Sequence, residues 1–191
     1  TLQGALVWSW ELRDEAQQSL FAQMGVFEGG ATLEDIEEVV DLSHLEDEPF
    51  ALDVIEPLVE RSLVRAAPQT GRFSMLVSIQ DFARQKLEDF PTKPSIFLRH
   101  AQCYAQWGDP KGMAEVQAHR IDALLQERGN IESAKYWALS EYSEETAKNA
   151  YLLGIAMSMI LEVQGPFHQA RALVDGMQGR APVLQELGHV L

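Results

Sequence analysis

The sequence predicts a mainly α-helical protein that contains one small β-hairpin. Apolar side chains recur at helical spacing along most of the 191 residues. Two short apolar runs, residues 62–66 and 72–77, flank the turn-forming segment 68–71, which is the pattern of a hairpin. One helix is predicted before this hairpin and another after it, and that order predicts a winged helix.

Two helices and a glycine turn are predicted at the start of the chain. Thr1 can cap the first helix, and Asp14 is suited to the N-terminus of the second. Gly29 and Gly30 then permit a turn with left-handed backbone geometry. The inward side chains are expected to be Leu2, Leu6, Val7 and Trp10 in the first helix and Leu20, Phe21 and Met24 in the second.

Two further helices precede the hairpin. Thr32, three residues before Asp35, predicts the start of a helix over residues 32–40, and a polar, acidic connection follows at 41–49. The next helix covers residues 50–61, although Pro57 is expected to kink it or delay its start. In a DNA-binding winged helix this helix would lie in the major groove. Its inward positions are expected to be Leu52, Ile55, Leu58 and Val59, and its exposed ones Asp53, Glu56 and Glu60, opposed only by Arg61.

After the hairpin, Ser78 is expected to cap a helix whose inner face carries Ile79, Phe82, Ala83 and Leu87. Two prolines within residues 90–94 mark a domain boundary, beyond which the pattern is helical throughout. Breaks are expected at residues 108–110, at Gly129 and at 165–166, with Asn130 capping one helix and Glu144 starting another. The expected fold is therefore a winged helix followed by an α-helical bundle.

The end of the chain fits, in part, a 34-residue helix-turn-helix repeat of the tetratricopeptide type over residues 151–184. Gly165, Ala170 and Pro182 stand at three of its characteristic positions, but Gly154 stands where the repeat prefers Trp. An ordinary helical hairpin is the alternative. The predicted domains are a winged helix at residues 1–90, a helical linker at 91–150 and the start of tetratricopeptide-like repeats at 151–191.

Charge is distributed unevenly along the chain. Up to residue 90 there are 18 acidic and 6 basic residues, a balance of −12, and beyond it 11 acidic and 9 basic, a balance of −2, which together give −14. Because Lys and Arg contacts to phosphates supply most non-specific DNA affinity, this composition predicts no direct contact with nucleic acid. The apolar run at residues 150–161 is shorter than the roughly 20 residues of a membrane span, and no secretory segment opens the chain. We therefore expect a cytoplasmic protein without membrane contact, and a piece of a longer chain.

No set of residues indicates catalysis, cofactor binding or a metal site. The sequence lacks a phosphate loop, a dinucleotide fingerprint, a nucleophile elbow and the zinc-protease motif. His100 and Cys103 share one helix face, but two ligands are too few for zinc, and a packed cysteine is the simpler interpretation. Adjacent acidic residues are interpreted as solvated surface. The four tryptophans, Trp8, Trp10, Trp107 and Trp137, are expected in the core rather than in an aromatic binding cage.

Several separated motifs occur in a characteristic order. They are residues 8–12 (Trp-Ser-Trp-Glu-Leu), 18–21 (Gln-x-Leu-Phe), 26–30 (Val-Phe-Glu-Gly-Gly), 58–64 (Leu-Val-Glu-Arg-Ser-Leu-Val), 72–76 (Arg-Phe-Ser-Met-Leu), 79–83 (Ile-x-x-Phe-Ala), 127–131 (Glu-Arg-Gly-Asn-Ile) and 134–138 (Ala-x-x-Trp-Ala). The ordered set resembles the segment just downstream of the nucleotide-binding core in bacterial STAND (NB-ARC-like) signalling ATPases. That family includes large transcriptional regulators with tetratricopeptide repeats.

The resemblance implies a regulatory role without catalysis in this segment. ATP or ADP and Mg²⁺ would bind an upstream domain of the same chain, against which the winged helix packs in the resting state. A protein or small-molecule inducer at the downstream repeats would release that contact. Met75, Leu76 and Val77 stand where some branches have a Met-His-Asp triplet that contacts nucleotide. Because Leu76 and Val77 lack hydrogen-bonding side chains, they are expected to contact the neighbouring domain rather than a phosphate.

Three hypotheses follow. The first is a protein-interaction segment of a STAND ATPase. The second is a DNA-binding winged helix with a helical dimerisation domain, which a basic stripe on the folded surface would favour and the acidic helix at residues 50–61 opposes. The third is a helical enzyme domain whose site forms only in the fold.

Overall fold

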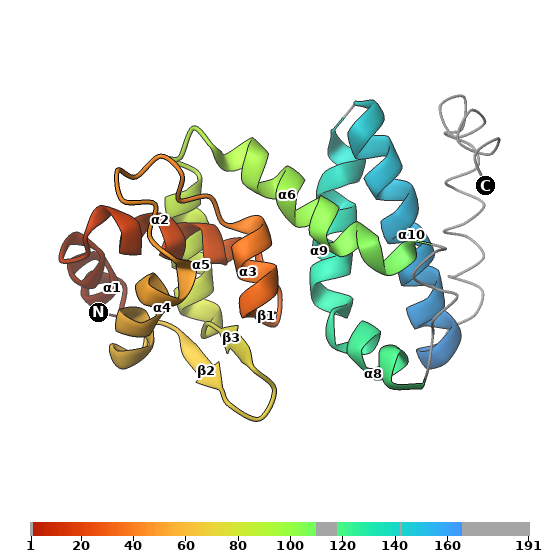
Figure 1. The fold of residues 1–191 in the computed structure, drawn as a ribbon, viewed down its shortest axis with the longest axis horizontal. Coiled ribbons are helices and arrows are strands. Elements are labelled where there is room, and N and C mark those ends of the chain that lie inside the picture. Colours follow the sequence, from red (N-terminus) through yellow and green to blue (C-terminus); the bar gives the residue numbers. More distant parts are fainter. Residues whose placement is uncertain (1, 110–117, 142, 166–191) are drawn as a thin grey trace. The chain divides into compact units, whose positions relative to one another are not determined.

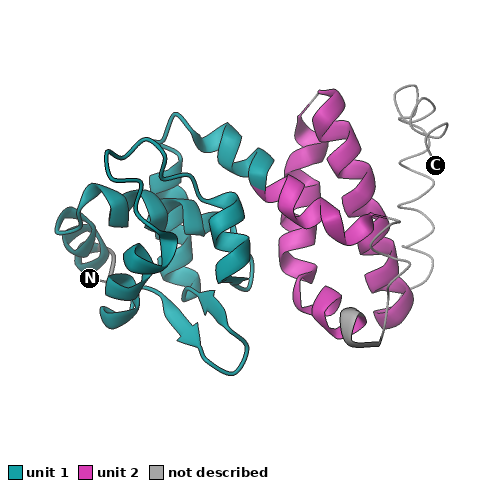
Figure 2. Ribbon diagram, viewed as in Figure 1, with its two compact units in different colours: residues 1–99 teal, residues 100–191 magenta. Residues whose placement is uncertain are grey.

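The computed structural model describes residues 2–109, 118–141 and 143–165. It is mainly helical, with one small antiparallel sheet, as the sequence predicts (Figure 1). The chain forms two compact units, residues 1–99 and 100–191 (Figure 2). Helix α6 (Lys93–Ala105) begins in the first unit and ends in the second. The predicted limits of the linker and of the repeats, at residues 90–91 and 150–151, stay predictions.

Unit 1 contains most of the elements that the sequence predicts. In chain order they are α1 (Leu2–Glu11), α2 (Glu15–Gln23), the 3₁₀ turn η1 (Met24–Val26), β1 (Ala31–Thr32), α3 (Leu33–Val39), α4 (Ala51–Glu60), β2 (Arg65–Ala67), β3 (Arg72–Ser74) and α5 (Val77–Leu87). The strands form an antiparallel sheet in the order β1-β3-β2. Helix α2, then β1, α3, α4 and a hairpin in this strand order make the arrangement of a winged helix.

The helix starts follow local capping chemistry. The Asp14 carboxylate accepts a hydrogen bond from the Gln17 backbone N–H at 2.8 Å, which confirms its predicted capping role. Thr32 and Asp35 form a reciprocal capping box at the start of α3. Thr32 is also the last residue of β1, a strand of two residues that the sequence did not reveal. So short a strand has no periodicity of its own and forms only because β3 lies beside it.

The glycine pair before β1 has different roles at its two positions. Both Gly29 and Gly30 have positive φ angles, +83° and +87°. A Cβ on Gly30 would lie 2.4 Å from the Phe73 carbonyl oxygen, whereas a Cβ on Gly29 would meet nothing within 4 Å. The Arg72 guanidinium donates a hydrogen bond to the Gly30 carbonyl at 2.7 Å. Gly30 therefore permits the close approach of β1 to β3.

The core of unit 1 is centred on α2, which packs against α4 and α5, and on the contact between α3 and α4. Five of its side chains are fully or almost fully buried: Leu20, Ile36, Ile55, Leu58 and Leu87. The Trp10 ring lies 5.8 Å from Phe21 and 6.3 Å from Phe82 between ring centroids, and this cluster attaches α1 to α2 and α5. Phe21 and Phe82 thus occupy the inward positions that their spacing predicted.

The hairpin and the start of α5 differ from the prediction. The strands are residues 65–67 and 72–74, not 62–66 and 72–77. Leu63 and Val64 are buried, and their backbone N–H groups both bond the Leu58 carbonyl, so this stretch completes the end of α4. Ser78 is not the cap of α5. Leu76 holds that position, because its carbonyl accepts bonds from the N–H groups of residues 79 and 80.

Three residues expected in the core lie on the surface. Val7 is 37% exposed, Leu52 39% and Trp8 66%. In α4 the buried positions are Ala51, Val54, Ile55 and Leu58. The centre of this buried face lies about 110° around the helix from Leu52, which is why Leu52 is exposed. Pro57 lies inside the helix, which begins at Ala51.

Unit 2 is helical in its described part. Besides the end of α6, it contains η2 (Gln106–Gly108), α8 (Ala118–Gln126), α9 (Arg128–Ser140) and α10 (Glu144–Gln164). Helices α9 and α10 pack along each other, and η2 packs on α10 so closely that a Cβ on Gly108 would overlap the Leu152 carbonyl. Ser143 and Thr146 form a capping box at the predicted start of α10.

One predicted cap in unit 2 is wrong. Asn130 does not begin a helix; it lies inside α9, and its buried amide donates to the Glu127 carboxylate at 2.8 Å. The predicted break is present two residues earlier, because α8 ends at Gln126 and Glu127 is the N-cap of α9, so Gly129 is the second residue of that helix. The predicted repeat over residues 151–184 lies, beyond residue 165, outside the described residues.

We predict that Gly30→Ala destabilises unit 1 more than Gly29→Ala does. Both substitutions place a Cβ at positive φ, which costs about 1–2 kcal/mol, but only Gly30 would also press that Cβ against the β3 backbone. Urea unfolding followed by circular dichroism measures both changes. Equal loss of stability in the two variants would contradict the proposed close approach of β1 and β3.

Candidate functional site

The candidate site is the outward side of α4, because this helix occupies the place at which a winged helix can meet a partner. We define the α4 surface as Phe50, Leu52, Asp53, Glu56 and Glu60. Phe50 is 75% exposed and Leu52 39% exposed, and the three acidic residues are exposed as well. Burial of the opposite face, against α2 and α3, fixes the direction in which these side chains point.

The carboxylates of the α4 surface form a row along the helix. Asp53, Glu56 and Glu60 are three and four residues apart, the spacing at which side chains of a helix are neighbours. None of them takes part in an ion pair or a side-chain hydrogen bond within the described part of the chain. Helix α4 contains no Lys or Arg. The surface is therefore negative, with two apolar side chains at its N-terminal end.

The basic groups nearest in sequence form no ion pair with this row in the described part of the chain. Arg61 follows α4 as its C-cap residue and lies close enough to Arg13 to affect it. Burial, and then repulsion from Arg61, lower the pKa of the Arg13 guanidinium, which donates to the Ser9 carbonyl at 3.0 Å and to the Gln17 side chain at 3.4 Å. Arg13 is buried, so it offers no charge to a partner.

The hairpin adds little positive charge. In residues 65–74, all of which are described, Arg65 is exposed, whereas Arg72 is half-buried and bonds the Gly30 carbonyl. The tip at residues 68–71 is exposed and uncharged, and its turn is closed by backbone bonds from Thr70 and Gly71 to the Ala67 carbonyl. A DNA-binding wing would be expected to present several phosphate-binding groups.

The connection between α3 and α4 is unusually long for a helix-turn-helix. It covers residues 40–50, where roughly three or four residues are typical. The Gln23 amide holds it in place, donating to the Asp41 carbonyl at 2.8 Å and accepting from the Asp41 N–H at 2.6 Å. Bonds from the Ser43 hydroxyl and N–H lower the pKa of the Asp41 carboxyl, which also pairs with Arg99 at 3.3 Å.

The residues predicted to contact a neighbouring domain lie at the start of α5. Met75 is half-buried, Leu76 is 42% exposed and Val77 is 74% exposed. Instead of continuing β3, as the sequence suggested, they form the junction between the strand and the helix. Two adjacent exposed apolar side chains fit an interaction surface, but the contact itself stays a prediction.

The residues considered above as possible metal ligands lie in the core. His100 and Cys103 are buried on α6, and the His100 ring lies 4.8 Å from that of Tyr104. Within the described ranges, no group of three or more His, Cys, Asp and Glu side chains is arranged to hold a metal ion. The helices of those ranges likewise include none with the length and hydropathy of a membrane span.

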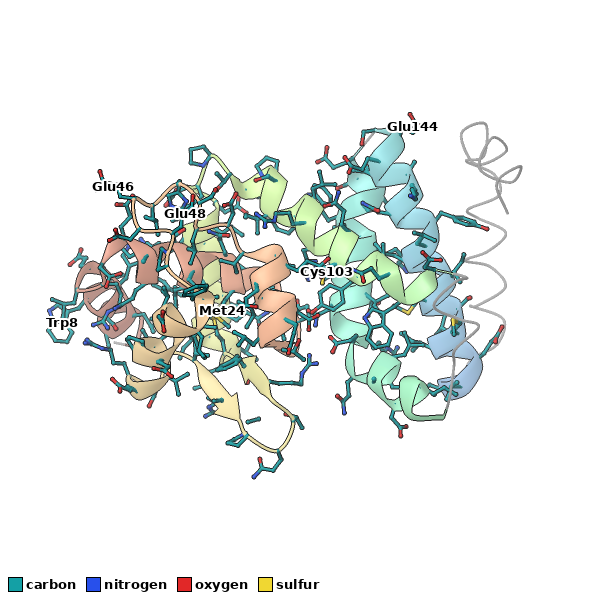
Figure 3. The ribbon with its side chains drawn as sticks, viewed as in Figure 1. Trp8, Met24, Glu46, Glu48, Cys103 and Glu144 are labelled. Carbon is teal, nitrogen blue, oxygen red and sulfur yellow. The ribbon has the colours of Figure 1, made fainter. Side chains whose placement is uncertain are left out.

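A second exposed apolar group, on and just after α1, was not anticipated. Trp8 and Leu12 are four residues apart and are 66% and 56% exposed. Figure 3 shows Trp8 pointing away from unit 1, whereas Met24 lies among its helices. Two tryptophans two residues apart cannot share one helix face, and that spacing could have revealed that only one of Trp8 and Trp10 is inward. For Leu52 the signal was the apolar pair Ala51 and Val54 on the other side of α4.

We predict that Leu76→Asp stabilises the isolated chain by up to about 1 kcal/mol. Helix α5 has no side-chain cap and no acidic residue in its first turn, and the extended backbone of Leu76 suits a capping carboxylate. Leu12→Asp is the matched control, because it replaces another exposed leucine at a helix C-terminus, where a negative charge is unfavourable. Thermal unfolding measures both. A fall in the melting temperature of Leu76→Asp would contradict the described start of α5.

Comparison with known proteins gives a partial match. The chain is 34% identical over 107 residues to proteins of Mycobacterium tuberculosis and Mycobacterium bovis, whose provisional names describe them as HTH-type transcriptional regulators. The match covers 54% of this chain but only 12% of each relative. No protein-family model and no solved structure matches the chain. The match therefore relates about half of this chain to a small part of proteins that are named as transcriptional regulators.

Proposed function

We propose that the chain is a non-catalytic interaction segment of a longer transcriptional regulator, in which the winged helix contacts protein through α4. The observation that carries this proposal is the charge of the α4 surface. The helix that would enter a major groove presents Asp53, Glu56 and Glu60 and contains no basic residue. The names of the relatives support the proposed class of protein, and the charge of the α4 surface supports the proposed kind of contact.

Electrostatics favours protein over DNA as the partner of α4. A protein that binds duplex DNA gains most of its non-specific affinity from Lys and Arg at the phosphates. Three carboxylates placed in the groove would instead face phosphates on both sides, and a like-charge contact weakens both affinity and association rate. Arg61, which follows α4, and Arg65 on the hairpin are two exposed cations against these three anions.

The names of the relatives are compatible with a protein-binding role for this segment. Those names describe whole proteins, of which the matched part is 12%. A helix-turn-helix elsewhere in such a protein could bind DNA, while this segment transmits the signal that controls it. The winged-helix fold is shared by DNA-binding and protein-binding modules, so the surface rather than the fold indicates the function.

A finer proposal concerns the neighbouring domain. The ordered motifs resemble the segment that follows the nucleotide-binding core of STAND ATPases, and the exposed Leu76 and Val77 offer an apolar surface for such a domain. The nucleotide and its Mg²⁺ would then bind outside this chain. Leu76 and Val77 would stabilise the resting state by packing, without touching a phosphate.

DNA binding by unit 1 is the second candidate. The winged-helix strand order and the names of the relatives favour it. It requires the hairpin, through Arg65, to contribute most of the phosphate contacts. The two candidates differ in their response to salt, because duplex binding weakens steeply as salt rises.

We predict that the 191-residue chain does not bind a fluorescent DNA duplex of random sequence. Fluorescence anisotropy at about 50 mM salt measures this binding. The protein concentration is raised to about 10⁻⁴ M, because this is the weak end of non-specific affinities for DNA. Low salt is used because it screens the charges least and so gives the strongest electrostatic attraction to DNA. Association that weakens steeply between about 50 and 200 mM salt, and is reduced by Arg65→Ala, would support the DNA-binding candidate instead.

We also predict that Leu76→Asp in the full-length protein changes ATP turnover and self-association, because it places a charge in the packed resting contact. Because Leu76→Asp is expected to leave the isolated chain stably folded, a change in turnover would result from loss of the contact with the neighbouring domain and not from unfolding. Leu12→Asp serves as the control and is expected to leave turnover unchanged. A full-length protein without ATPase activity, or one whose turnover Leu76→Asp leaves unaltered, would refute the finer proposal.

A further inference from the structure

The three carboxylates of the α4 surface repel one another, although Asp53 itself lies in the first turn of α4, where a negative charge is favourable. Like charges three and four residues apart on a helix repel each other by a few tenths of a kcal/mol per pair. Asp53 and Glu56 form one such pair, and Glu56 and Glu60 form another. No cation of the described residues pairs with them. A local arrangement that opposes stability, without a compensating contact, is typical of a surface used for binding.

The same surface also carries two exposed apolar residues. Phe50 is the most exposed aromatic residue in unit 1, at 75%, and Leu52 lies one turn before Glu56. Exposed aromatic side chains are enriched among the anchors of protein interfaces, surrounded by polar groups that exclude water. The α4 surface therefore combines an apolar end with an acidic row about two turns long.

Resting on the function proposed above, we propose that the α4 surface binds a basic amphipathic helix of a protein partner. Charge complementarity identifies this occupant. Lys or Arg side chains spaced three and four residues apart on the partner helix would pair with Asp53, Glu56 and Glu60. Apolar side chains beside them would cover Phe50 and Leu52. Binding of an amphipathic helix through one of its faces is a recurring mode of protein recognition.

The pairing would do more for specificity than for affinity. Exposed ion pairs each contribute about 0.2–1 kcal/mol, so three of them supply a modest share of binding. Their larger effect is to guide a basic helix toward α4 and to repel an acidic one. The α4 surface has five residues, fewer than the roughly 20–30 residues on each side of a stable interface, so the complex is expected to be transient.

The test uses a designed helical peptide of about 15 residues, with Lys at positions i, i+3, i+4 and i+7 and Leu on the adjacent face. Binding to the isotope-labelled 191-residue chain is followed by NMR. The amide signals of α4 and of Phe50 are expected to shift, and the affinity is expected to fall as salt rises. A peptide with Glu in place of every Lys is the negative probe and should leave these signals unchanged.

A matched pair of triple variants tests the assignment. Asp53→Asn, Glu56→Gln and Glu60→Gln together are expected to weaken peptide binding by about tenfold or more. The control combines Glu46→Gln, Asp47→Asn and Glu48→Gln, which removes the same charges from exposed positions of the same unit. Figure 3 shows Glu46 and Glu48 on the connection before α4, away from the body of that helix. This control is expected to change the affinity by less than about twofold.

Phe50→Ala tests the apolar part of the surface. Because Phe50 is exposed and provides no side-chain cap to α4, its removal is expected to leave the fold intact, which circular dichroism checks. Peptide affinity should fall by about fivefold or more, as for a truncated interface anchor.

Three results would overturn the inference. They are the absence of shifts in α4, equal weakening by the two triple variants, and shifts of the same signals with protein concentration alone, which would make a second copy the occupant. The proposed function has a separate test, because duplex binding in the anisotropy assay would contradict it. Absence of both duplex and peptide binding would refute this inference alone.

Discussion

The packing of α5 against the segment between α2 and β1 is the constraint on which the rest of unit 1 depends. A Cβ on Gly25 would lie 2.8 Å from the Arg84 backbone nitrogen, so the two elements meet almost backbone to backbone. Arg84 donates to the Gly25 carbonyl at 2.8 Å and pairs with Glu28, and the buried Gln80 amide donates to the Phe27 carbonyl at 2.7 Å. These contacts satisfy the backbone of a buried turn while joining residues more than fifty positions apart.

That packing determines which face of α4 is free. Because α5 and α2 occupy one side of the core, α4 packs on α2 with Val54, Ile55 and Leu58 and presents the opposite face outward. The acidic row and Phe50 are on that free face. The same packing leaves Leu76 and Val77 exposed where α5 begins. The two surfaces of interest thus result from one arrangement of helices.

The acidic charge of the α4 surface favours a protein partner, whereas the winged-helix fold by itself would favour DNA. The strand order is that of a winged helix, and the relatives are named as HTH-type regulators. Yet the helix that would read DNA has no cation, and the long connection before it departs from the compact helix-turn-helix. Because phosphate contacts are a physical requirement of duplex binding, we give the surface more weight than the fold.

By itself the sequence determined the fold class, the hairpin, the caps at Asp14 and Thr32 and the start of α10, because these features depend on periodicity and on local hydrogen bonds. It also determined that residues 50–61 carry acidic charge. Only the tertiary structure decided that β1 joins the sheet, that Asn130 lies within α9, and that Trp8 and Leu52 are exposed while Trp10 packs inward. Those outcomes depend on which neighbour covers each face, and contacts between residues distant in the chain have no local signal.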